Sequence, residues 1–156
     1  MELPEIVLRP VAESDAEILL RWAPDKLGGY TFPCEAEGIR RMVREWNAGR
    51  VNGKSFIMRL IEADGNAVGL LSLYGDGTVS VGVSIAADMR RRGYAKAAVC
   101  AAKEIARGCG CTLLTGQNRV ENAASIALCE GCGFACVGRT VNRKGHKVFL
   151  WEMPLG

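Results

Sequence analysis

The chain has 156 residues, of which 49% are hydrophobic and 24% charged, and its formal net charge is +3 at pH 7. These values are ordinary for one globular domain with a sizeable core, and the charge is too small to indicate nucleic-acid binding. No apolar run reaches the roughly 20 residues of a membrane span and MELPEIVLRP lacks a signal-peptide pattern, so we expect a single cytoplasmic domain over residues 1–156 without a nucleic-acid or membrane partner.

The N-terminal part predicts a short strand and two helices. Residues 5–10 alternate and end at Pro10, which indicates a strand. Ser14 and Glu17 have the spacing of a capping box, so a helix is expected to begin there and to end at Pro24. Residues 35–48 predict a second helix, because one face of it would carry Ile39, Met42, Val43 and Trp46.

The middle of the chain predicts an antiparallel meander. Strands are expected at 55–63, 67–74 and 78–86, and the glycine-containing turns 64–66 and 75–77 separate them. The two faces of the third strand differ. One face carries Val79, Val81, Val83 and Ile85, whereas Ser80, Gly82 and Ser84 make the other small and polar, so a ligand could lie against it.

The C-terminal half predicts a βαβ unit and two closing strands. A helix at 94–107 and a strand at 111–117 follow the third strand of the meander, so the strands at 78–86 and 111–117 should be parallel, with a right-handed crossover. A short helix at 122–130 precedes strands at 134–141 and 147–154. The fold class is therefore a single α/β domain.

Three arginines, Arg90, Arg91 and Arg92, stand directly before the predicted helix at 94–107. Positive side chains are unfavourable at a helix N-terminus, where free N–H groups and the helix dipole attract anions. The arginines are therefore either solvated or paired with a bound anion. Gly93 would let such an anion approach the backbone closely.

The seven cysteines allow a zinc site as an alternative. Its ligands would come from Cys109, Cys111, Cys129, Cys132 and Cys136. Structural zinc sites usually present paired knuckles on tight turns, whereas Cys129 falls on a helical pattern and Cys136 on a strand. We therefore favour buried thiols and expect no metal.

The arginine loop resembles a family signature. Arg90-x-x-Gly93-x-Ala95 is similar to the R/Q-x-x-G-x-G/A motif of the Gcn5-related N-acetyltransferases (GNAT). Residues 118–134 resemble that family's N-x-x-x-N-x-x-S-x-x-x-x-E-K-x-G-F pattern, except that Gly131 replaces the lysine; the matching residues are Asn118, Asn122, Ser125, Glu130, Gly133 and Phe134. Residues 6–22 resemble the ribosomal-protein and spermidine-type branch of the family.

The resemblance implies a mixed sheet with a splayed parallel strand pair, flanked by helices, that binds acetyl-coenzyme A. It implies that the pantetheine arm pairs with the backbone around Val83, Ser84 and Ile85, and that Asn118, Asn122 and Ser125 line its channel. The phosphates would lie in the loop and first helical turn formed by Arg90, Arg91, Arg92, Gly93, Tyr94, Ala95 and Lys96. The ordinary alternative for Asn122 is a helix N-cap.

The catalytic positions depart from the best-known family pattern. Where many relatives have a glutamate base and a tyrosine acid, this chain has Gln117 and Cys129, and Ser80 occupies a cleft position that is often glutamate. A glutamine takes no proton, whereas the thiol of Cys129 could donate one. A water-relayed base remains an alternative.

The acceptor is expected to be a primary amine of a small molecule, an amino acid or a peptide N-terminus. Candidate contacts are Tyr30, Phe32 and the single histidine, His146; Trp46 and Arg50 are further candidates. A non-catalytic acyl-coenzyme A sensor of the same fold is the rival interpretation. Dimers are common in the family, so a homodimer stays open.

Overall fold

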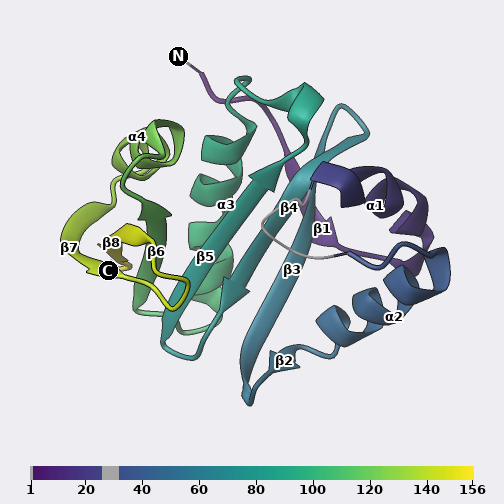
Figure 1. Ribbon diagram of the computed structural model, residues 1–156, viewed down its shortest axis with the longest axis horizontal. Coiled ribbons are helices and arrows are strands. Elements are labelled where there is room, and N and C mark those ends of the chain that lie inside the picture. The colour runs from purple at the N-terminus through teal and green to yellow at the C-terminus, as the bar shows by residue number, and fades with distance from the viewer. Residues whose placement is uncertain (1, 26–31) are drawn as a thin grey trace.

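The computed structural model describes residues 2–25 and 32–156, so the candidate Tyr30 lies outside the described residues. An eight-stranded sheet carries helices on both faces (Figure 1). The strands are β1 Val7–Pro10, β2 Arg50–Val51, β3 Lys54–Ala63, β4 Asn66–Tyr74, β5 Thr78–Ile85, β6 Leu113–Arg119, β7 Ala135–Val141 and β8 Lys147–Pro154. The helices are α1 Ala16–Trp22, α2 Ala36–Asn47, α3 Tyr94–Gly108 and α4 Ala123–Gly131, with short 3-10 turns at Glu13–Asp15, Ala23–Asp25 and Ala87–Met89.

Two cores lie on opposite faces of the sheet. The strand order is β1-β3-β4-β5-β6-β8-β7, and β2 pairs with β3. Met58, Leu60 and Leu70 pack with α1 and α2 on one face. Residues of the other parity, such as Leu71 and Val79, pack with α3 on the opposite face. The predicted α/β class, the meander and the parallel β5–β6 pair are confirmed.

The start of the first helix differs from the prediction. A 3-10 turn, Glu13–Asp15, precedes α1, and Asp15 is its N-cap without a side-chain capping bond. The predicted capping box of Ser14 and Glu17 is therefore wrong. Asp15 instead turns back, where one carboxylate oxygen accepts a hydrogen bond from the Ala12 N–H at 2.7 Å. The two-residue strand β2 was not predicted because it is too short to show a period.

Arg9 links this turn to the sheet. Its guanidinium donates to both carboxylate oxygens of Asp15, at 2.7 and 2.8 Å, and to Glu62 on β3 at 2.6 Å. These bonds from Arg9 hold the pKa of Asp15 below its ordinary 3.8. Because the pKa of Asp15 is lower in the folded protein, its ionised carboxylate stabilises the folded state at pH values above 3.8. This stabilisation is lost as the pH falls below that value and the carboxylate becomes protonated.

We expect Asp15→Asn to lower the free energy of unfolding by about 1–2 kcal/mol at pH 7, because hydrogen bonds between charged groups are lost. The difference from wild type should shrink as the pH falls below 3.8. Urea unfolding at pH 7, 5 and 3 measures both effects. An equal loss at all three values would contradict the role given to the ionised carboxylate.

Two absences bear on the predictions. Among residues 2–25 and 32–156, no helix is long and apolar enough to cross a membrane. Within the same residues no three His, Cys, Asp or Glu side chains gather as a metal site would require, so the zinc alternative has no geometric support.

Candidate active site

The strands β5 and β6 part soon after they begin to pair. Their parallel register joins only Thr78, Val79 and Ser80 to Leu113, Leu114 and Thr115. Beyond this point β5 continues to Ile85 and β6 to Arg119 without pairing to each other. The two strands thus open a V-shaped gap in the middle of the sheet, whose apex lies at Ser80 and Thr115 (Figure 1). The splay implied by the family resemblance is therefore present.

The free edge of β5 presents backbone groups to this gap. Antiparallel pairing alternates hydrogen-bonded and non-bonded pairs, and the Ala86 N–H donates to the Val68 carbonyl on the β4 side at 2.8 Å. In the β4–β5 register, residues of the same parity as Ala86, including Ser84, therefore face β4. The N–H and C=O groups of Val81 and Val83 face the gap. Of the predicted pantetheine contacts, the register favours Val83 and Ile85 and directs the backbone of Ser84 away.

The loop from β5 to α3 exposes the first turn of a long helix. Gly93 is the N-cap of α3 in the left-handed conformation, with φ of +85°. A Cβ at this position would lie 3.1 Å from Pro4, so both the conformation and the close approach favour glycine. Arg91 also has a positive φ of 64°. Because no side chain caps α3, its first N–H groups are open to an anion.

The arginines of this loop have different surroundings. The Nε of Arg90 donates to the Ile85 carbonyl at 3.1 Å, so this side chain ties the loop to the end of β5. Arg91 and Arg92 are exposed. Across the part of the chain that the structure describes, none of the three lies within 4.0 Å of a carboxylate. The loop therefore retains positive charge that a bound anion would neutralise.

The first turn of α3 points in two directions. Tyr94 and Ala95 are half-buried and pack against the core. Lys96 instead reaches α4, because its Nζ lies 3.6 Å from where a Cβ of Gly131 would be. A cation thus stands beside the position where the family pattern has its lysine.

The helix α4 begins at a side-chain cap. The Oδ1 of Asn122 accepts the Ser125 N–H at 3.1 Å, so the N-cap interpretation of Asn122 is confirmed. Ser125 lies in the first turn, and its backbone takes part in the cap. Both residues follow the end of β6, which does not pair with β5.

A buried hydrogen-bonded chain connects β8, β6 and α4. Trp151 Nε1–H donates to Asn118 Oδ1 at 3.1 Å, and Asn118 Nδ2 donates to the Cys129 Sγ at 3.5 Å. Asn118 is only 6% exposed, so its amide is used inside the protein. Since Asn118 donates to Sγ, the S–H of Cys129 is free to point elsewhere. Burial raises the pKa of Cys129 above its ordinary value, so the group is a thiol at neutral pH.

We expect Asn118→Ala to lower the free energy of unfolding by about 2–3 kcal/mol, because it leaves a cavity and an unpaired indole N–H. The neighbouring Gln117→Ala is the control, since Gln117 is exposed and should change stability by less than about 0.5 kcal/mol. Denaturant unfolding compares them. Equal effects would contradict the buried role of Asn118.

The comparison with known families agrees with this arrangement. The model of the acetyltransferase (GNAT) domain family matches residues 5–135. The chain belongs to this family. No curated protein matches it in sequence, so the comparison is made with solved structures.

Solved structures of other acetyltransferases share the fold of this GNAT domain at low sequence identity. RimL, a ribosomal L7/L12 α-N-protein acetyltransferase in complex with coenzyme A, has 18% identity and a TM-score of 0.83 over 96% of this chain and 94% of that one. Mycobacterium smegmatis RimJ with coenzyme A disulfide has 19% identity and a TM-score of 0.83, over 97% and 82%. Spermidine/spermine N-acetyltransferase SpeG from Vibrio cholerae has 16% identity and a TM-score of 0.77, over 97% and 95%.

The face of the GNAT sheet opposite α3 carries the remaining catalytic candidates. Ser80, at the apex of the gap, and Gln117, on the open part of β6, are both exposed. Sequence reasoning missed Glu152. The register pairs Ser80 with Thr115 and Thr115 with Glu152, so this half-exposed carboxylate stands on the same face, two strands from Ser80 and roughly 10 Å across. The position of Glu152 on this face follows only from the pairing of β6 with β8, which the sequence alone does not show.

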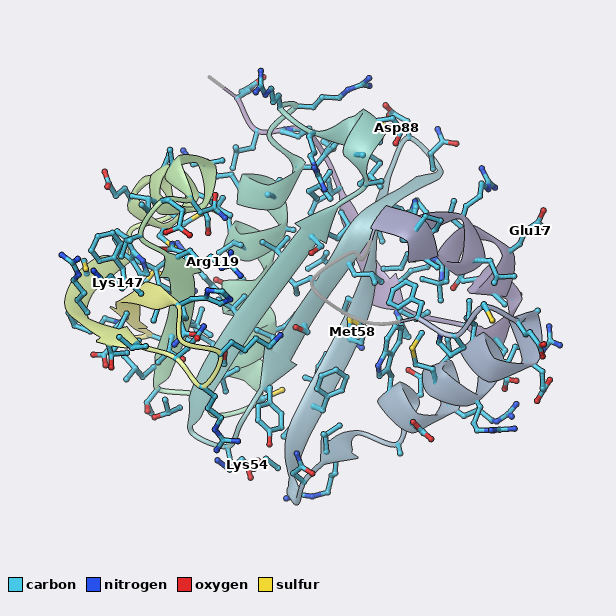
Figure 2. All side chains as sticks on the ribbon, in the orientation of Figure 1. Glu17, Lys54, Met58, Asp88, Arg119 and Lys147 are labelled. Atoms are coloured by element: carbon cyan, nitrogen blue, oxygen red, sulfur yellow. The ribbon has the colours of Figure 1, made fainter. Side chains whose placement is uncertain are left out.

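The predicted acceptor contacts do not gather in one place. His146 Nε2 lies 2.7 Å from Arg119 Nη2; because a guanidinium only donates, this imidazole nitrogen accepts and its lone pair is occupied. Phe32 is buried against Trp46 in the core beneath α1 and α2. It is therefore a core residue in this structure and not a surface contact for the acceptor. Figure 2 labels Arg119 on the β6 side of the gap.

Proposed function

We propose that this acetyltransferase domain transfers the acetyl group of acetyl-coenzyme A to a primary amine of a small molecule, an amino acid or a peptide N-terminus. The observation that carries the proposal is the unpaired edge of β5, which leads from the N-terminus of α3 to the apex of the gap. An extended amide chain such as pantetheine matches the groups of this edge, as an added strand would. The diphosphate then meets the N–H groups of α3 and the arginines.

The residues near the apex suit the proton transfers of this reaction. The amine must lose a proton before its nitrogen attacks the thioester carbon, and Glu152 accepts that proton through water. A C–N bond forms, the oxyanion is stabilised by N–H groups of the β5 edge, the newly bonded nitrogen gives its second proton to water, and the C–S bond breaks. The Cys129 thiol, held by Asn118, gives its proton to the leaving thiolate and regains one from solvent, so one proton is released overall.

Release of coenzyme A thiol in the presence of an amine panel tests the proposal. We expect release that depends on both acetyl-coenzyme A and an amine. Binding of acetyl-coenzyme A without amine-dependent release would instead support the rival sensor, and absence of binding would contradict both.

The proton donor can be tested through its pH dependence. Because burial raises the pKa of Cys129, the wild-type kcat should fall at alkaline pH, as the thiol loses its proton. Cys129→Ala should lower kcat about tenfold or more and remove that alkaline decrease. Cys136→Ala, an exposed thiol on β7, is the control. A Cys129→Ala profile that keeps the alkaline decrease would exclude this donor.

We also propose that the protein works in the cytoplasm and that it forms a homodimer, since dimers are common in the family. Light scattering in solution tests the dimer, and a monomer mass at working concentration would contradict it.

A further inference from the structure

An open pocket lies beside the apex of the gap, on the face that carries α2. Its volume is about 340 Å³, within the range of small-molecule sites. The lining residues come from β2 and the turn after it, β3, β4 and β5; they are Val51, Asn52, Phe56, Ser72, Tyr74, Ser80, Val81 and Gly82.

The pocket reaches the apex of the gap, to which the edge of β5 would lead the acetylated end of the cosubstrate. Ser80 is the last β5 residue paired with β6, and Val81 and Gly82 are the first beyond it. A molecule in the pocket therefore has one end at the apex and the other toward β4 and β2. A Cβ on Gly82 would lie 2.7 Å from the Ser72 hydroxyl oxygen, so the missing side chain of Gly82 keeps this end of the pocket open.

The described lining of the pocket carries no charged side chain. Hydroxyls of Ser72, Ser80 and Tyr74 and the Asn52 amide supply polar groups, and no carboxylate is among the described lining residues. The ammonium of Lys54 lies 6.0 Å from the centroid of the Tyr74 ring. Figure 2 labels Lys54 at this end of the sheet. The nearby Asp76 is 3.6 Å from Arg50, which offsets its charge.

We propose that this pocket binds the acceptor, and that the acceptor is a compact primary amine whose far end is neutral or carries a carboxylate rather than a second ammonium. The inference rests on the proposed acetyl transfer and names its substrate class. A second ammonium would enter a pocket without a carboxylate and approach Lys54, and like charges brought together are strongly unfavourable. A carboxylate would meet Lys54 instead.

Three probes with the same five-carbon chain separate these possibilities. Pentylamine, 5-aminopentanoate and 1,5-diaminopentane share the reacting amine and differ at the far end. Thiol release gives kcat/KM for each probe, and the value for the diamine is divided by its two amino groups. We expect kcat/KM for 5-aminopentanoate and for pentylamine to exceed that of the diamine by about tenfold or more. A carboxylate that meets Lys54 should give 5-aminopentanoate an advantage over pentylamine, and Lys54→Gln should reduce that advantage.

The location is tested by Gly82→Ala. The added methyl group narrows the pocket, so KM for the amine should rise about tenfold or more while the affinity for acetyl-coenzyme A is unchanged. Gly108→Ala is the control, because a Cβ there meets nothing within 4 Å. A preference for the diamine, an unchanged KM in Gly82→Ala, or no turnover of all three amines by protein that binds acetyl-coenzyme A would overturn the inference. If the wild-type protein does not bind acetyl-coenzyme A, the proposed function itself is overturned.

Discussion

Gly93→Asp is expected to weaken acetyl-coenzyme A binding about 100-fold or more, because a carboxylate placed roughly 5 Å from a diphosphate repels it by several kcal/mol at a partly screened site. The added side chain stands at the N-terminus of α3, where the phosphates are proposed to meet free N–H groups. Isothermal titration with acetyl-coenzyme A measures the change directly.

Gly93→Asn is the matched control. Both variants adopt the same φ of +85° and bring the same Cβ to 3.1 Å from Pro4, and Asn and Asp tolerate this conformation better than other residues. Only the charge differs. The unliganded Asp variant should be no less stable than the Asn variant, because an acid is favourable at a helix N-terminus. Equal affinities of the two variants would contradict an anion at this position.

Glu152→Gln is expected to lower kcat/KM about 100-fold at neutral pH, the usual size of a general-base contribution. The loss should shrink toward pH 10, where a much larger fraction of an alkyl amine is neutral without help than at pH 7. Amine-dependent thiol release between pH 6 and 10 measures this trend.

The control for this variant is Glu130→Gln, which removes an exposed carboxylate from α4. It should retain full activity, and both variants should bind acetyl-coenzyme A as the wild type does. A Glu152→Gln defect that is the same at every pH would contradict proton acceptance by this residue.

Sequence periodicity predicted most of this fold because the buried residues alternate cleanly. On β5, Val79 and Ile85 are buried whereas Ser80 and Gly82 are exposed, as the two-residue period requires. The loop motif was equally informative. Its glycine, Gly93, is the N-cap of α3 and has the positive φ that favours glycine. Local signals were sufficient for these features.

Features that depend on pairing between distant segments could not be predicted. The facing of the Ser84 backbone toward β4, and the position of Glu152 on the same face as Ser80, follow from the register, which a single strand does not encode. Asn118 was expected to line a channel, yet Trp151 and Cys129 occupy its amide. Asp15 replaced the predicted cap because Arg9, six residues away, holds its carboxylate.

Amide hydrogen exchange on β5, followed by NMR with and without acetyl-coenzyme A, tests most directly whether the cosubstrate binds along the free edge of this strand. If pantetheine adds to the free edge, amides directed into the gap, above all that of Val83, gain protection, while those of Gly82 and Ser84, already bonded to β4, change little. If acetyl-coenzyme A is bound and protection on β5 does not alternate between these two sets of amides, or if no β5 amide gains protection, the ligand lies elsewhere.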